Sequence, residues 1–367
     1  MLGELEKIWS FLRSKIPTKI FYVKDVEEIF DSIRTLLHSR EISSPSEFLI
    51  ISGRMGYEVI GRSLEEKLSS EVSRENIKKL IIDKEYFDKK IIDEEIIGKL
   101  LRSINNIVVI GVGGGFVLDI AKYVASYTRN KDLVLIPTTM SSNAIMSPFS
   151  VIRAENRIEA FKTIYPKTVL ICLDILSNVP KRHIASGFAD SLAKYTALYD
   201  LRLSYWFSDL EYDRSLFKIA RRLTSILINE AHHFVGRSKE SIENLLIAEL
   251  IDGALMGLSG TTRIVAGSEH LIALALTMLS PQGLHGEYVG VGTIISSYIQ
   301  GRKWSLIRDI LLRASAPTNI HQLNLEEKVL IEAVKKAPDM RNWYTILGRF
   351  RDERKIREVL KESRVIE

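Results

Sequence analysis

Cysteine is almost absent from this sequence, because Cys172 is the only one in 367 residues. A disulfide within the chain is therefore impossible, and a zinc site built from several thiolates is excluded. Any bound metal ion must take its ligands from oxygen and nitrogen atoms. Glutamine is also scarce, and this scarcity beside abundant Lys, Glu and Arg is a balance reported for proteins from hot environments.

Long apolar runs are missing as well. No segment offers the roughly 18 uninterrupted apolar residues of a membrane span, and the opening MLGELEKIWSFL mixes charged residues into the apolar ones, unlike a signal peptide. The 51 basic and 46 acidic residues are spread along the chain, so the net charge of +5 forms no basic arm. We therefore expect a folded cytoplasmic protein with no membrane insertion and no nucleic-acid partner.

Short apolar runs recur through the first half of the chain, as buried strands of a parallel sheet would. They lie at residues 47–53, 77–83, 106–115, 132–137 and 168–174. Charged stretches with helical periodicity lie between them, at 61–74, 92–104 and 116–128. This alternation predicts an α/β fold, with a Rossmann-like parallel sheet in a domain of residues 1–178.

The strand pattern disappears after Pro180. Helical periodicity continues at 187–206, 214–232, 239–256, 267–279, 286–299, 304–313 and 325–337, with Gly or Pro in the connections. We expect residues 179–367 to form a second, all-helical domain.

A glycine-rich turn follows the strand at 106–115 and opens a helix. Backbone N–H groups and the positive end of a helix can hold a pyrophosphate at such a turn, and glycines let the phosphate approach. The residues concerned are Gly113, Gly114, Gly115, Phe116 and Val117. Phe116 occupies the last glycine position of the usual G-x-G-x-x-G pattern, and glycines also serve tight turns without any ligand.

Hydroxyl side chains follow the next strand, at the same carboxyl edge of the predicted sheet. Open parallel sheets bind ligands at this edge. The candidates are Thr138, Thr139, Met140, Ser141 and Ser147. They could hydrogen-bond a nicotinamide or a phosphate, although such turns often bond only to their own backbone.

Three possible metal ligands stand far apart in the helical half: Asp190, His270 and His285. One carboxylate and two imidazoles with an open fourth position suit a catalytic zinc ion. Glu269 and Glu287 adjoin the histidines and either orient them or are simply solvated. We expect the other histidines to be structural; they are His38, His183, His232, His233 and His321.

Several segments, taken in order, resemble the glycerol-1-phosphate dehydrogenase family of the glycerol dehydrogenase-like superfamily. They are GGGxxxDxAK at 113–122, PTTMS at 137–141, GFADSLAKYTALYD at 187–200, LHGEYVGVG at 284–292 and RNWYTILG at 341–348. The resemblance implies zinc on Asp190, His270 and His285, with Asp190 also close to the substrate. It implies that the pyrophosphate of NAD or NADP lies on residues 113–117, with the nicotinamide side near the hydroxyl segment.

Two positions depart from that family's pattern. Asn143-Ala144 stands where the family has Asp-Gly, and Leu274 stands where it has a second histidine four residues after His270. Both lost groups are ones that the family uses near the substrate, so Asn143 and Leu274 put the identity of the substrate in question.

The resemblance implies an enzyme that reduces dihydroxyacetone phosphate to sn-glycerol 1-phosphate for archaeal ether lipids, with residues 1–178 binding the nucleotide and 179–367 binding metal and substrate. We expect a small phosphorylated ketone or polyol as substrate and a homo-oligomeric assembly. Two alternatives stay open. One is a zinc-dependent dehydrogenase of another small polyol, hydroxyketone or sugar phosphate, and the other is a non-catalytic nucleotide-binding paralogue.

Overall fold

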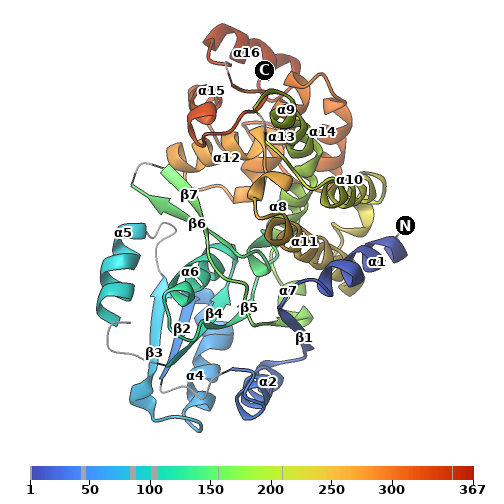
Figure 1. Ribbon diagram of the computed structural model, residues 1–367. Coiled ribbons are helices and arrows are strands. Elements are labelled where there is room, and N and C mark those ends of the chain that lie inside the picture. The colour runs from blue at the N-terminus through green and yellow to red at the C-terminus, as the bar shows by residue number, and fades with distance from the viewer. Residues whose placement is uncertain are drawn as a thin grey trace. The chain divides into compact units, whose positions relative to one another are not determined.

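The computed structural model describes residues 2–42, 47–82, 88–100, 106–155, 157–208, 210–348 and 350–367. The chain divides into two compact units (Figure 1), an α/β unit of Lys15–Val179 and a helical unit of Met1–Ser14 with Pro180–Glu367. The division after Val179 lies one residue from the expected boundary. Helix α1 (Leu2–Arg13) belongs with the helical unit, because it packs on α11 (Lys239–Ser259) and buries Leu5 and Leu12.

The α/β unit contains a six-stranded sheet with the order β1-β8-β5-β4-β2-β3, and every neighbouring pair is parallel. This confirms the expected Rossmann-like parallel sheet. Its strands are β1 (Lys19–Val23), β2 (Glu47–Gly53), β3 (Ile77–Ile82), β4 (Ile107–Gly113), β5 (Asp132–Pro137) and β8 (Thr168–Cys172). The helical segments of the unit are α2 (Val26–His38), 54–68, 89–100, α6 (Gly115–Ser126) and α7 (Leu173–Ser177).

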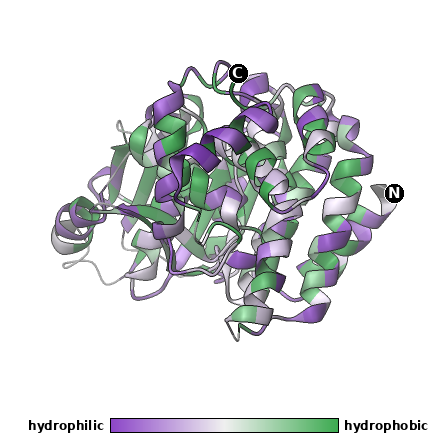
Figure 2. Ribbon diagram, turned by 90° about the horizontal axis from the view of Figure 1, so that it is seen from above, coloured by the Kyte–Doolittle hydropathy of each residue, from purple (hydrophilic) through white to green (hydrophobic). Residues whose placement is uncertain are grey.

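Helices cover both faces of this sheet because side chains alternate along each strand. On β4, Val108 and Ile110 enter an apolar cluster with residues of α2 and of the segment 54–68. Gly111 faces the other side, where an added Cβ would lie 2.7 Å from the Cβ of Ala121 on α6. The missing side chain therefore lets α6 pack closely on the strand. In Figure 2 the strands are mostly green, as expected for a sheet buried on both faces.

Three strands were not expected. The first, β1, lies at the edge of the sheet, and exposed Phe21 and Tyr22 break its apolar alternation. The other two, β6 (Phe149–Ala154) and β7 (Arg157–Lys162), form an antiparallel pair outside the main sheet. Their charged side chains at 153, 157, 159 and 162 hid the strand pattern in the sequence.

The helical unit contains no strand among its described residues. After α1 its helices are α8 (Lys181–Leu192), α9 (Lys194–Phe207), α10 (Arg214–Asn229), α11, α12 (Ser268–Leu279), α13 (His285–Ile299), α14 (Trp304–Arg313), α15 (Glu327–Lys336) and α16 (Glu353–Glu362). The stretch expected as one helix at 187–206 is two helices that meet at Ala193, and α16 was not expected. Among the described residues, no helix combines the length and the hydrophobicity of a membrane span.

Local signals in the sequence set the ends of these helices. The side chain of Ser238 accepts a hydrogen bond from the backbone N–H of Ser241, which satisfies a free donor at the start of α11. Gly260 ends the same helix at a φ of 69°, a left-handed conformation that favours glycine. The long α11 thus has both of the end signals that its sequence predicts.

Candidate active site

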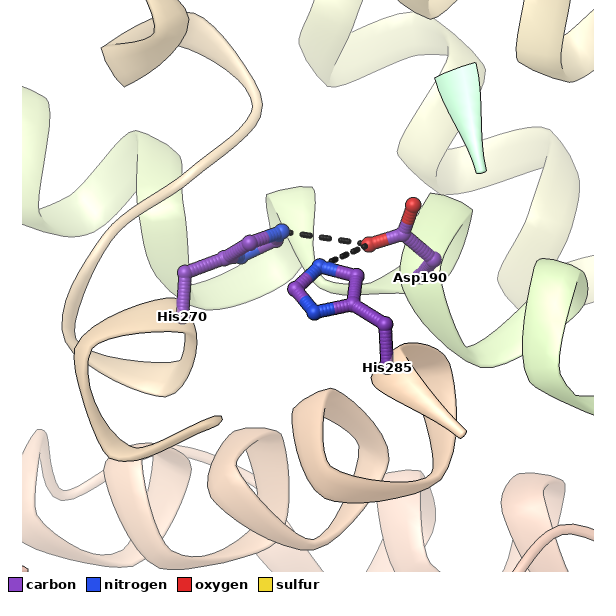
Figure 3. Close-up of side chains that lie close together, drawn as sticks. All are labelled: Asp190, His270 and His285. Atoms are coloured by element: carbon purple, nitrogen blue, oxygen red, sulfur yellow. Dashed lines mark hydrogen bonds and ion pairs between the residues drawn. The ribbon is translucent and has the colours of Figure 1, made fainter. Parts of the chain in front are cut away.

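The three candidate metal ligands come together inside the helical unit (Figure 3). Asp190 lies on α8, His270 on α12 and His285 at the start of α13. Nε2 of His270 lies 3.1 Å from Oδ1 of Asp190, and Nε2 of His285 lies 3.6 Å from the same oxygen. One ligand atom from each residue lies within 4.8 Å of the others. The carboxylate of Asp190 and the imidazoles of His270 and His285 therefore lie close together, although the first and last of these residues are 95 positions apart in sequence.

Missing side chains on α13 allow this approach. A Cβ on Gly286 would lie 1.9 Å from the backbone oxygen of Ser186 on α8, and a Cβ on Gly292 would lie 2.5 Å from the backbone oxygen of Glu269 on α12. Real Cβ atoms do not approach oxygen so closely. The two glycines therefore let α13 pack against both of the other ligand-bearing helices, which gives the segment LHGEYVGVG a physical role.

Glu269 fixes the orientation of the His270 ring. Its carboxylate accepts from Nδ1 of His270 at 2.9 Å, from the backbone N–H of Gly267 at 2.6 Å and from the hydroxyl of Thr196 at 2.7 Å. The bond to Nδ1 directs Nε2 toward Asp190, an arrangement typical of metal-binding histidines. Glu287 does not play this role for His285, because its carboxylate bonds Arg182 and the N–H of Leu284.

The electrostatics favour an ionised Asp190. Burial opposes the charge, but the hydrogen bond from His270 and the two nearby imidazoles hold the pKa of Asp190 below its usual value. For His270, burial lowers the pKa, and the hydrogen bonds to Asp190 and Glu269 outweigh it and raise the pKa to about 9. Burial lowers the pKa of His285 more than the nearby Asp190 raises it, and the charge on His270 adds to the lowering. At neutral pH the metal-free site thus holds one imidazolium between two carboxylates.

Buried charges also lie behind Asp190. Lys194 is fully buried, and its Nζ lies 2.7 Å from a carboxylate oxygen of Asp252. Glu249 on α11 is fully buried, and neither of its oxygens has a hydrogen-bond partner among the described residues. Burial and the charges of Asp190 and Asp252 raise the pKa of Glu249 well above its ordinary value. The positive Lys194 adds to the forces that keep Asp190 ionised.

The glycine-rich turn lies where the sequence places it, between β4 and α6. Gly113 ends the strand, Gly114 precedes the first residue of the helix, and Gly115 begins it, while Phe116 and Val117 form the first turn. A Cβ on Gly114 would lie 2.8 Å from the hydroxyl of Thr139. Gly114 is partly exposed. Free N–H groups at the start of α6 and this open backbone suit a phosphate.

The hydroxyl segment lies beside that turn, because the N–H of Thr138 donates to the carbonyl of Gly113 at 2.9 Å. Thr139 and Ser141 are partly exposed and their hydroxyls lie 3.2 Å apart. Met140 is fully buried, and so is Ser147. Met140 and Ser147 therefore lie in the interior of the α/β unit. Thr138, Thr139 and Ser141 are partly exposed to solvent.

Ser147 belongs to a buried polar cluster. Nζ of Lys122 donates to the carbonyl of Ser147 at 3.0 Å and lies 2.7 Å from the carboxylate of Asp119. Asp119 also accepts from the backbone N–H of Val151. Asp119 and Lys122 of the motif GGGxxxDxAK thus hold the segment after the hydroxyl turn against α6, a role that the sequence analysis did not assign.

The two departures from the family pattern lie on different units. Leu274 is buried on α12, one helical turn after His270 and on the same side of the helix. Asn143 is partly exposed at the start of the short turn Asn143–Ile145 in the α/β unit.

Curated proteins similar to this chain are dehydrogenases. Glycerol-1-phosphate dehydrogenase [NAD(P)+] of Saccharolobus islandicus is 32% identical over 91% of this chain and 92% of its own length. The enzyme of the same name from Metallosphaera sedula is 33% identical over 76% of this chain and 83% of its own length. The chain belongs to the glycerol-1-phosphate dehydrogenase family. This confirms the resemblance seen in the sequence and makes the chain a member of the NAD(P)-dependent alcohol dehydrogenases.

Family and fold comparisons agree with this membership. Residues 26–180 match the model of the family described as iron-containing alcohol dehydrogenase. The crystal structure of a "probable glycerol dehydrogenase" from Sinorhizobium meliloti superposes with a TM-score of 0.74 at 20% identity, over 96% of this chain and 98% of that one. At this identity the likeness concerns the fold, which is that of the glycerol dehydrogenases.

We expect Gly292→Ala to disrupt the ligand cluster. Its added methyl group must push α13 away from the backbone of Glu269, and overpacking of this kind typically costs about 1–3 kcal/mol. Gly290→Ala is the matched control, because its Cβ would lie 3.2 Å from a side chain, the Cβ of Ala189. Urea unfolding and zinc titration of both variants test this. Equal stability and equal zinc affinity in the two variants would contradict the role of Gly292.

Zinc binding should strengthen as the pH rises to about 9. Below that pKa the His270 ring holds a proton that the metal must displace, so the affinity should rise by up to about tenfold per pH unit. Competition titrations with a chelator at pH 7.0 and 8.5 measure the rise. The carboxylate of Glu269 raises the pKa of His270, so the variant Glu269→Gln should lower that pKa. In this variant the zinc affinity should therefore stop increasing at a lower pH. An affinity in the wild type that stays constant over this interval would contradict the raised pKa.

A methyl group at Gly114 should weaken NADH binding, even when Thr139 is shortened so that the methyl group fits in the free protein. Because a Cβ there meets the hydroxyl of Thr139, we compare Gly114→Ala/Thr139→Ala with Thr139→Ala alone. We expect the double variant to bind NADH at least tenfold more weakly, which is about 1.4 kcal/mol. Fluorescence titration gives both constants. Equal constants would mean that Gly114 serves only the turn.

Proposed function

We propose that this chain reduces dihydroxyacetone phosphate to sn-glycerol 1-phosphate with NADH or NADPH as the hydride donor. The observation that carries the proposal is the meeting of Asp190, His270 and His285, from three helices, within 4.8 Å in a chain of the glycerol-1-phosphate dehydrogenase family. Their oxygen and nitrogen donors fit a zinc ion with one open position. The same cluster argues against a non-catalytic paralogue, which would have no need to keep it.

Asp190, His270 and His285 would hold the zinc ion. When bound, zinc acts as a Lewis acid on a carbonyl oxygen and stabilises the negative charge that develops there, which typically contributes several kcal/mol. The chain supplies an ionised Asp190 and a His270 whose Nε2 is aimed by Glu269. A proton completes the reduction. Because Leu274 offers no polar atom, water or another residue would supply that proton.

The nucleotide would bind on the α/β unit. Gly113, Gly114 and Gly115 would let the pyrophosphate approach the backbone at the start of α6, with Phe116 and Val117 in the same helical turn. Partly exposed Thr138, Thr139 and Ser141 would face the nicotinamide side. Buried Met140 and Ser147 would support this segment from behind.

The product would be the glycerol phosphate backbone of archaeal ether lipids, which places the enzyme in phospholipid synthesis. We propose a homo-oligomeric enzyme of the cytoplasm with a small phosphorylated substrate and no nucleic-acid partner. The relatives of Saccharolobus islandicus and Metallosphaera sedula carry the name of the corresponding enzyme, which supports the proposed reaction.

A second candidate function has specific support. Leu274 and Asn143 replace two polar groups that the family uses near its substrate, and Leu274 lies one turn from His270 on the same helix. A site with an apolar residue there could favour another hydroxyketone, polyol or sugar phosphate. Asn143 can still donate or accept one hydrogen bond with a hydroxyl, but it lacks the charge of aspartate.

We expect turnover of dihydroxyacetone phosphate by the zinc-loaded protein, slower than in relatives that have both groups. Restoring them in Asn143→Asp/Leu274→His should raise kcat/KM by about tenfold, equal to about 1.4 kcal/mol of transition-state stabilisation. NADH or NADPH oxidation with a panel of ketones measures this, and His270→Ala is the inactive control. If the natural protein reduces a different ketone well and dihydroxyacetone phosphate not at all, the second candidate function replaces the first.

A further inference from the structure

Glu230, His232 and His233 form a second cluster of metal-binding side chains, in the helical unit. Glu230 directly follows α10, and the two histidines lie in the short turn Ala231–His233. One ligand atom from each lies within 4.8 Å of the others. Nε2 of His233 is 3.7 Å from a carboxylate oxygen of Glu230, and the centroids of the two imidazole rings are 4.0 Å apart. From the sequence both histidines were expected to be structural, since a histidine on a helix usually is.

The backbone of this turn is held in place on three sides. The N–H of Glu230 donates to the carbonyl of Ile226 in the last turn of α10. The amide of Asn244 on α11 donates to the carbonyl of His233 at 3.3 Å. Phe234, the next residue, is fully buried against Phe188 of α8. With the backbone anchored, the side chains alone would bring their ligand atoms to bonding distance.

The position of the cluster favours a cation. It follows the carboxyl end of α10, where unpaired carbonyl groups create a partial negative charge, and Glu230 adds a full one. Two imidazoles with one carboxylate select zinc, nickel or copper ions and not magnesium or calcium ions, which prefer oxygen ligands. His232 is exposed and His233 half-buried, so solvent can complete the coordination.

We propose that Glu230, His232 and His233 form a second binding site for a divalent transition-metal ion such as zinc. The ion would join the end of α10 to the connection that leads to α11. Binding is weaker than at Asp190, His270 and His285, because the exposed side chains lose rotational freedom when they order around the metal. The site is separate from the proposed reaction and does not depend on it.

Zinc counting on the full-length protein tests the site. After removal of metal, equilibrium dialysis against an excess of free zinc should load two ions per wild-type chain. We expect one ion in His270→Ala and one in His232→Gln/His233→Gln, and none in the variant that combines all three changes. His321→Gln, which alters another exposed histidine, is the matched control and should retain both ions.

A thermal measurement adds a second readout. In the His270→Ala background, zinc should raise the melting temperature, and this rise should disappear when His232 and His233 are also replaced by Gln. A wild-type zinc content that is unchanged in His232→Gln/His233→Gln would overturn the proposal. Failure of the catalytic site is distinguishable, because then His270→Ala, and not the double variant, keeps the wild-type zinc content.

Discussion

The close packing of α13 against α8 and α12 is the constraint on which the site depends. Gly286 approaches the backbone of Ser186, and Gly292 approaches the backbone of Glu269, at distances that leave no space for a methyl group. Interiors packed at this density transmit small displacements to their neighbours. Because Asp190, His270 and His285 each lie on one of these helices, their mutual distances follow from the helix spacing. The glycines thus matter to the chemistry without touching it.

This packing also concentrates charge in the interior of the helical unit. Asp190, Glu269 and Lys194 are all buried, and an unpaired charge there would cost several kcal/mol. Opposite charges offset this cost. Lys194 forms an ion pair with Asp252, and His270 forms hydrogen bonds to both Asp190 and Glu269. The positive charge of the protonated His270 ring balances the carboxylate of Asp190, as the charge of a metal cation would. A zinc ion would satisfy the same carboxylate with a larger charge, which is why the cluster suits a metal site.

Much of the fold and the site could be predicted from the sequence. The strands β2, β3, β4, β5 and β8 are continuous apolar runs, and the glycine turn after β4 lies where its pattern indicated. Asp190, His270 and His285 stood in segments that resembled one family, so they could be chosen together. In contrast, β1 and the pair β6–β7 were missed, because exposed aromatic or charged residues interrupt their alternation.

The partners of the ligands could not be predicted with equal success. Glu269 and Glu287 both stand beside or near a ligand histidine in sequence, but only Glu269 bonds one, since Arg182 holds Glu287. The pairing of Lys194 with Asp252, and the burial of Met140 and Ser147, depend on tertiary packing that local pattern does not encode. For the same reason Glu230, His232 and His233 were recognisable as a cluster only in three dimensions.

Diffraction from crystals of the zinc-loaded protein would show whether the three helices hold the proposed metal ion at Asp190. Data collected on both sides of the zinc absorption edge locate the ion by its anomalous signal. We expect the strongest peak within about 2.0–2.2 Å of a carboxylate oxygen of Asp190 and of Nε2 of His270 and His285. A protein that is active with zinc yet shows no peak at these three residues would contradict the claim.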